Sequence, residues 1–146
     1  MMRSLLFVPA DGGAKLDKAM ASGADAVILD LEDSITPERK AQARAAALEF
    51  LKAAQTKKPR PRLLVRINGL DTGMIDADLE AVVAGRPDAI VFPKAEGGAS
   101  VVHLDAKLTA RDSTACARIL IPPSGRRWNR PPDCFSPAPS AMPARG

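Results

Sequence analysis

Three short apolar segments of this chain each end in a cluster of charged or amide side chains, and no other feature constrains the fold as strongly. The segments cover residues 26–29, 63–65 and 89–92, and helix-like stretches separate them. Short apolar runs with helical segments between them are typical of a parallel sheet that is buried on both faces. The clusters that follow them are Asp30-Leu31-Glu32-Asp33, Arg66-Ile67-Asn68-Gly69 and Pro93-Lys94-Ala95-Glu96.

The polar clusters predict a site at one edge of this sheet. In β/α folds the carboxyl ends of the parallel strands carry the active site. We therefore expect the acidic residues, the guanidinium of Arg66, the amide of Asn68 and the ammonium of Lys94 to share one face. Such a set of groups suits an anionic substrate and a hard metal ion.

Each of these residues also has a purely structural interpretation. Glu32 and Asp33 can cap the next helix or balance a cation, and Arg66 can form an ion pair with either of them. Asn68 favours a tight turn, and Lys94 suits a solvated loop. The two interpretations of Arg66 are compatible, because an ion pair can orient a guanidinium that also binds a ligand carboxylate.

Hydrophobic periodicity predicts an alternating order of strands and helices. Alternation with right-handed crossovers gives either an open doubly wound sheet or a closed barrel. Thr36 is the expected N-cap of the second helix, with Pro37 at its first position. The predicted strands are residues 4–9, 25–30, 62–67, 89–92 and 117–121, and the predicted helices are residues 14–22, 37–54, 74–84 and 100–110.

The net charge of +4 comes entirely from the C-terminal segment. Residues 1–117 contain sixteen Lys or Arg and sixteen Asp or Glu, whereas residues 118–146 contain five Arg and one Asp. We therefore expect no nucleic-acid partner. No apolar run approaches the ~20 residues that span a bilayer, and the N-terminus lacks the long apolar core of a signal peptide. The expectation is a cytoplasmic protein with no membrane partner.

The sequence motifs resemble one enzyme family. The stretch RSLLFVPADGGAKLDKAMASGADAVILDLEDSITPERKAQAR is followed in order by VRINGLDTGMIDADLEAVV and PDAIVFPKAE. Over residues 3–120 this pattern resembles the citrate lyase β-subunit-like branch of the HpcH/HpaI aldolase family, which includes malyl-CoA and citramalyl-CoA lyases. The resemblance implies a (β/α)8 TIM barrel, usually a homo-oligomer. It also implies Mg2+-dependent cleavage or formation of a carbon–carbon bond in a 3-hydroxyacyl-CoA or a related oxo acid.

The resemblance also implies roles for individual residues. Arg66 matches the arginine that grips the substrate carboxylate or carbonyl. Asn68 and Lys94 are further substrate-binding candidates because of their places in the strand-end clusters, not because of the resemblance. Glu32 and Asp33 match an acidic pair beneath the metal site. Lys15 and Lys18 fall where the family touches the CoA nucleotide.

The sequence departs from the family after residue 120. The two carboxylates that bind the metal in the family lie in later segments that do not appear here, so no metal ligand is assigned. Residues 121–146 instead hold seven of the chain's thirteen prolines and show no hydrophobic period. We expect residues 1–120 to form four to five β/α units of a truncated barrel, followed by an irregular Pro/Arg-rich tail, hypothesised to be frameshifted.

Two hypotheses about function follow from this departure. The first is a carbon–carbon lyase of the citrate lyase β-like family whose chain is incomplete and inactive alone. The alternative is a non-catalytic half-barrel that binds an acyl-CoA or a full-length paralogue.

Overall fold

Five parallel strands alternate with four α-helices in the computed structural model, which describes residues 3–93, 98–111 and 118–120. Within these residues no helix is long and apolar enough to cross a membrane. The predicted fifth strand, residues 117–121, lies partly outside the described residues, and the predicted tail, residues 121–146, lies wholly outside them. The elements are β1 (Leu5–Pro9), α1 (Ala14–Met20), β2 (Ala26–Asp30), η1 (Pro37–Arg39), α2 (Lys40–Ala54), β3 (Arg62–Arg66), η2 (Leu70–Thr72), α3 (Ile75–Gly85), β4 (Ala89–Val91), α4 (Gly98–Arg111) and β5 (Arg118–Leu120).

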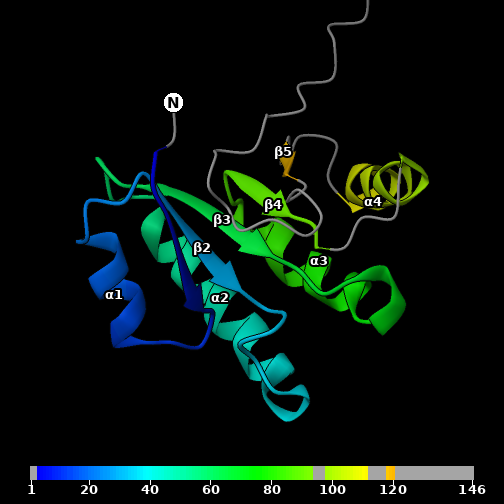
Figure 1. The fold of residues 1–146 in the computed structure, drawn as a ribbon, viewed down its shortest axis with the longest axis horizontal. Coiled ribbons are helices and arrows are strands. Elements are labelled where there is room, and N and C mark those ends of the chain that lie inside the picture. The colour runs from blue at the N-terminus through cyan, green and yellow to red at the C-terminus, as the bar shows by residue number, and fades with distance from the viewer. Residues whose placement is uncertain (1–2, 94–97, 112–117, 121–146) are drawn as a thin grey trace, which may run out of the picture.

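The strands lie in the order of the chain. The sheet runs β1-β2-β3-β4-β5, and every neighbouring pair is parallel. Parallel crossovers of one hand that always move to the next strand place their helices on one face of the sheet, and residues of the four helices share one apolar cluster with the strands. Figure 1 shows α1, α2 and α3 together on that side. The prediction of an α/β fold with a parallel sheet is confirmed.

Both faces of the central strands are buried, as their continuous apolar sequences predict. Alternate residues point to opposite faces of a strand, so each strand contributes to two clusters. The larger cluster packs the sheet against the helices, and the smaller lies on the opposite face. The larger contains Val27, Leu29, Leu63, Val65 and Ile90, and the smaller contains Ala26, Ile28, Leu64, Ala89 and Val91.

The start of the second helix differs from the prediction. A 3-10 turn over Pro37–Arg39 precedes α2, which begins only at Lys40. Thr36 occupies the N-cap position of this turn rather than of α2, and its side chain makes no capping hydrogen bond. Its carbonyl oxygen instead accepts a hydrogen bond from the N–H of Arg39 at 3.0 Å. The sequence pattern could not separate a 3-10 turn from a first α-helical turn, since both place Pro at the start.

Helices α2 and α3 approach each other closely at a glycine. A Cβ atom added to Gly85 would lie 2.6 Å from Cδ1 and 2.8 Å from Cβ of Leu51. The second of these atoms sits next to the α2 backbone, so a rotamer change alone cannot relieve the contact. Gly85 therefore sets the distance between the two helices that carry the buried polar residues described below.

We predict that Gly85→Ala destabilises the fold. The added methyl group overpacks a well-filled contact, which typically costs about 1–3 kcal/mol. Gly98→Ala is the matched control, because a Cβ there meets nothing within 4 Å. Urea unfolding of both variants measures the effect. Equal stability of the two variants would contradict the proposed close contact.

Candidate functional site

An ion pair between Asp30 and Arg66 lies at the carboxyl ends of β2 and β3. The two residues stand opposite each other in the parallel register. Arg66 Nε donates to Asp30 Oδ1 at 2.8 Å, and Arg66 Nη2 donates to Asp30 Oδ2 at 2.7 Å. By strand alternation both side chains share the face of Ile28 and Leu64, opposite the helices. This bidentate geometry fixes the plane of the guanidinium.

The Asp30 carboxylate also organises the turn that follows β2. It accepts hydrogen bonds from Glu32 N at 2.9 Å, Ser34 N at 3.1 Å and Ser34 Oγ at 2.6 Å. Burial by itself raises the pKa of Asp30, but the hydrogen bonds from Arg66, Ser34 and Glu32 outweigh it and leave that pKa below its usual value. Hydrogen bonding to Asp30 raises the pKa of Arg66. Both groups are therefore ionised at neutral pH.

The remaining edge of the guanidinium faces the two acidic residues chosen from the sequence. Arg66 Nη1 lies 3.8 Å from Asp33 Oδ2 and 4.0 Å from Glu32 Oε1. These distances allow electrostatic attraction but exceed a hydrogen bond. The expected association of Arg66 with Glu32 and Asp33 is present, but the hydrogen-bonded partner is Asp30. The Phe7 ring of β1 lies beneath the guanidinium, 4.9 Å from Cζ to the ring centroid.

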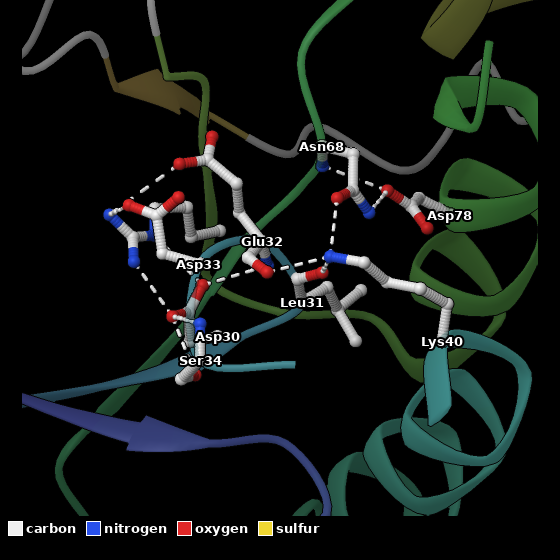
Figure 2. A network of polar contacts seen from close by, with 9 residues as sticks. Asp30, Leu31, Glu32, Asp33, Ser34, Lys40, Asn68 and Asp78 are labelled. Atoms are coloured by element: carbon white, nitrogen blue, oxygen red, sulfur yellow. Dashed lines mark hydrogen bonds and ion pairs between the residues drawn. The ribbon is translucent and has the colours of Figure 1, made fainter. Parts of the chain in front are cut away.

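Asn68 lies in the same region but turns into the protein. Its exposed fraction is 2%, and its Oδ1 accepts a hydrogen bond from Lys40 Nζ at 2.8 Å. Its backbone N and Nδ2 donate to Asp78 Oδ2 at 2.8 and 2.7 Å. Figure 2 shows this chain of contacts beside the acidic turn. Substrate binding by Asn68 stays a prediction, whereas its contacts to α2 and α3 are visible.

Lys15 and Lys18 take no part in the contacts described above. Lys15 and Lys18 lie on the exposed surface of α1. Lys94 falls outside the described residues. Of the residues selected from the sequence, the structure therefore gathers Glu32, Asp33 and Arg66 around one guanidinium edge.

Magnesium does not fit the described residues by themselves. Within residues 3–93, 98–111 and 118–120, no group of three or more His, Cys, Asp or Glu side chains could hold a metal ion. The Asp30 oxygens already accept hydrogen bonds from Arg66, Ser34 and Glu32. The chemistry that these residues support directly is recognition of a carboxylate or carbonyl oxygen by Arg66.

Sequence reasoning missed Asp30 as the partner of Arg66. It also missed Lys40, Asp78 and Arg44 of α2, whose Nε donates to Asp78 Oδ1 at 2.6 Å. The available signal for Asp30 was its place at the end of a strand next to the strand of Arg66. The signal for Lys40 was a cation in the first turn of a helix, where the helix dipole disfavours positive charge. Asp78 sits between apolar residues of α3 and reads as an ordinary helix-surface acid until the packing is known.

The chain is similar to characterised enzymes and solved structures. Residues 3–120 match the family described as HpcH/HpaI aldolase/citrate lyase. An L-malyl-CoA/beta-methylmalyl-CoA lyase of Cereibacter sphaeroides is 43% identical over 111 residues, which cover 74% of this chain and 34% of the relative. A (3S)-malyl-CoA thioesterase of the same organism is 39% identical over 99 residues, which cover 68% of this chain and 34% of the relative.

A solved structure is similar in both sequence and fold. It is a citrate lyase beta subunit from M. tuberculosis, complexed with oxaloacetate and magnesium. The TM-score is 0.63 at 33% identity, and the match covers 82% of this chain and 46% of that one. The chain spans about a third of the length of the curated relatives it matches.

We predict that Asp30→Asn destabilises the protein by about 2–4 kcal/mol, because it removes the only carboxylate that forms hydrogen bonds with this mostly buried guanidinium among the described contacts. The side chains of Arg66 and Asp30 are only 20% and 4% exposed. Asp76→Asn is the control, since Asp76 also forms ion pairs with two side chains, Lys107 and Arg111, but its own side chain is 53% exposed. Chemical denaturation should show a much smaller loss for the control. Similar losses would mean that the Asp30 pair is no stronger than a surface pair.

The same pair makes stability depend on pH in a defined direction. The pKa of Asp30 is lower in the folded chain, so the unfolded chain binds the proton more readily. The contribution of the Asp30 carboxylate to the free energy of unfolding is thus complete above the pKa of an unfolded aspartate, about 3.9. It declines as the pH falls through the lower pKa of Asp30 in the folded chain. Unfolding measured from pH 7 to pH 2.5 should show the wild-type advantage over Asp30→Asn shrinking only at the acidic end. A constant difference would contradict the lowered pKa.

Proposed function

Because this chain belongs to the HpcH/HpaI aldolase/citrate lyase family, we propose that residues 3–120 form the first four to five β/α units of a (β/α)8 barrel. The sequential parallel order of the strands supports this, since a doubly wound sheet reverses its strand order at a switch point. The buried apolar cluster on the face opposite the helices corresponds to a barrel interior. Homo-oligomerisation and a cytoplasmic location stay predictions.

The proposed activity is carbon–carbon bond cleavage or formation in a CoA ester or a related oxo acid. The observation that carries it is the Arg66 guanidinium, which Asp30 holds rigidly at the carboxyl end of the sheet. Two of its three nitrogens bind Asp30, so Nη1 is the one directed away from the pair. A preoriented donor of this kind stabilises oxygen atoms on which negative charge develops.

The chemistry can be followed with malyl-CoA as the example. A base removes the proton of the 3-hydroxyl group, that carbon becomes the aldehyde of glyoxylate, and the C2–C3 bond breaks. The electron pair of the broken bond passes to the acetyl-CoA part as an enolate, which then takes up a proton. We propose that Arg66 binds the carboxylate or carbonyl oxygen of the two-carbon oxo acid. A similar solved structure, the citrate lyase beta subunit from M. tuberculosis, contains both oxaloacetate and magnesium. The described residues of this chain do not form a complete magnesium site.

We propose further that the 146-residue chain does not carry out this cleavage alone. The chain spans about a third of its curated relatives, and the described part holds no complete metal-binding group. The alternative proposal is a non-catalytic half-barrel that binds an acyl-CoA or associates with a full-length paralogue. A thioesterase activity is a further candidate, because the thioesterase relative shares 39% identity with the chain.

One experiment tests whether the chain alone has lyase activity or thioesterase activity. The purified chain is incubated with malyl-CoA, with and without Mg2+, and glyoxylate and free CoA thiol are measured separately. We expect neither product from the chain alone. Glyoxylate with acetyl-CoA would show that the chain is an active lyase, and thiol without glyoxylate would show a thioesterase.

Binding tests the proposed role of Arg66 independently of turnover. Arg66→Lys should weaken oxaloacetate binding at least about tenfold, because lysine cannot bind Asp30 and the ligand with a planar fork. Arg62→Lys is the matched control, since Arg62 is exposed at the amino end of the same strand. Isothermal titration calorimetry gives both affinities. Absence of oxaloacetate binding by the wild-type chain, or equal affinities of the two variants, would overturn the role of Arg66.

A further inference from the structure

Lys40 is a buried cation whose hydrogen bonds converge on the turn after β2. Its exposed fraction is 8%, and its Nζ donates to the carbonyl oxygens of Leu31 and Glu32, both at 2.6 Å. The third acceptor is Asn68 Oδ1 at 2.8 Å. An ammonium group has three protons, so these contacts use all of its donor capacity. Figure 2 shows the side chain reaching from α2 to this turn.

The contact to Asn68 connects Lys40 to a second, fully buried group. Asp78 of α3 has an exposed fraction of 0%, and its Oδ2 accepts hydrogen bonds from the backbone and side chain of Asn68. Its Oδ1 accepts from Arg44 Nε at 2.6 Å. The network therefore joins the turns after β2 and β3 to helices α2 and α3. Asp78 forms an ion pair with Arg44, and of the nearby carboxylates it also contributes most to offsetting the charge of Lys40.

The position of Lys40 is unfavourable for the helix itself. Lys40 opens α2, follows Arg39, and has no acidic residue in the first turn to offset the helix dipole. Burial also lowers the pKa of Lys40, despite the nearby carboxylates of Asp78, Asp30 and Glu32. A residue that violates local preferences in this way indicates a role in the tertiary structure.

The geometry links Lys40 to the candidate site through the backbone of the turn after β2. The peptide units of Leu31 and Glu32, which Lys40 holds, lie between Asp30 and Asp33 in the chain. The N–H of Glu32 binds Asp30 Oδ1, the same atom that accepts from Arg66 Nε. Movement of this turn would therefore disturb the bidentate pair and the carboxylates beside it.

We propose that Lys40 is a positioning residue, which from inside the protein fixes the turn after β2 and so sets where Asp30, Glu32 and Asp33 lie relative to Arg66. The catalytic meaning of this role rests on the proposed function, in which Arg66 contacts the substrate. The geometric role does not depend on it. The two are therefore measured separately.

The geometric role is tested by hydrogen exchange in 15N-labelled protein. Two protons report on the site, the Arg66 Nε–H and the Glu32 backbone N–H, since both donate to Asp30. For each proton we take the ratio of its exchange rate to that of the backbone amide of Val27, which lies in the interior of β2. In Lys40→Met we expect both ratios to be at least tenfold higher than in the wild type. Lys52→Met, on the exposed face of the same helix, should leave that ratio unchanged.

A merely structural lysine would give a different pattern. General destabilisation accelerates exchange at Val27 as well, so the ratio would stay constant, and this result would overturn the proposal. If Lys40→Met does not fold, Asn68→Ala is measured in the same way, since it removes one of the three acceptors. For Asn68→Ala we expect exchange ratios at least threefold above those of the wild type. Unchanged ratios would again overturn the proposed role of Lys40.

Oxaloacetate binding then tests the consequence for the site. Lys40→Met should weaken oxaloacetate binding at least tenfold at a temperature where the variant is folded, while Lys52→Met binds like the wild type. Failure of the wild type to bind oxaloacetate would count against the proposed function alone, because the exchange ratio still decides the role of Lys40. Faster exchange with unchanged affinity for oxaloacetate would show that Lys40 fixes the turn but does not position the substrate site, which would overturn this part of the proposal.

Discussion

The bidentate contact between Asp30 and Arg66 is the interaction on which the candidate site depends. The two residues are register partners at the ends of adjacent parallel strands, so the backbone ladder delivers them to the same place. Neither ionised side chain would be stable in this buried position without the opposite charge of the other. Because the pair is mutually satisfied, the guanidinium has a fixed plane and one edge turned toward Glu32 and Asp33. A donor that is held in one orientation can stabilise an oxygen atom on which negative charge develops.

Behind this pair, a buried polar network adds to the apolar contacts that join the helices to the sheet. Lys40, Asn68, Asp78 and Arg44 connect two strand-end turns to two helices. In the interior each of these groups would be costly without a partner, but here the bonds are nearly all made. The benefit of such a network is geometric: directional bonds hold the turns in one arrangement, whereas apolar packing tolerates small shifts.

Much of the fold followed from the sequence because strand burial leaves a local signature. Continuous apolar runs at residues 26–29, 63–65 and 89–92 had to be buried on both faces, and the structure places them at the centre of a parallel sheet. Helix starts were less predictable. Pro37 suits both a 3-10 turn and an α-helical turn, and the choice depends on how the turn packs rather than on its own residues.

The sequence by itself determined the family, the parallel α/β fold and the choice of Arg66, Glu32 and Asp33, because these follow from local patterns and their order. Only the tertiary structure decided that Arg66 pairs with Asp30, and that Lys40 and Asp78 lie buried on either side of Asn68. These residues come from separate strands and helices. Their contacts depend on strand register and helix packing, which bring together residues that are 10 to 36 positions apart in the chain.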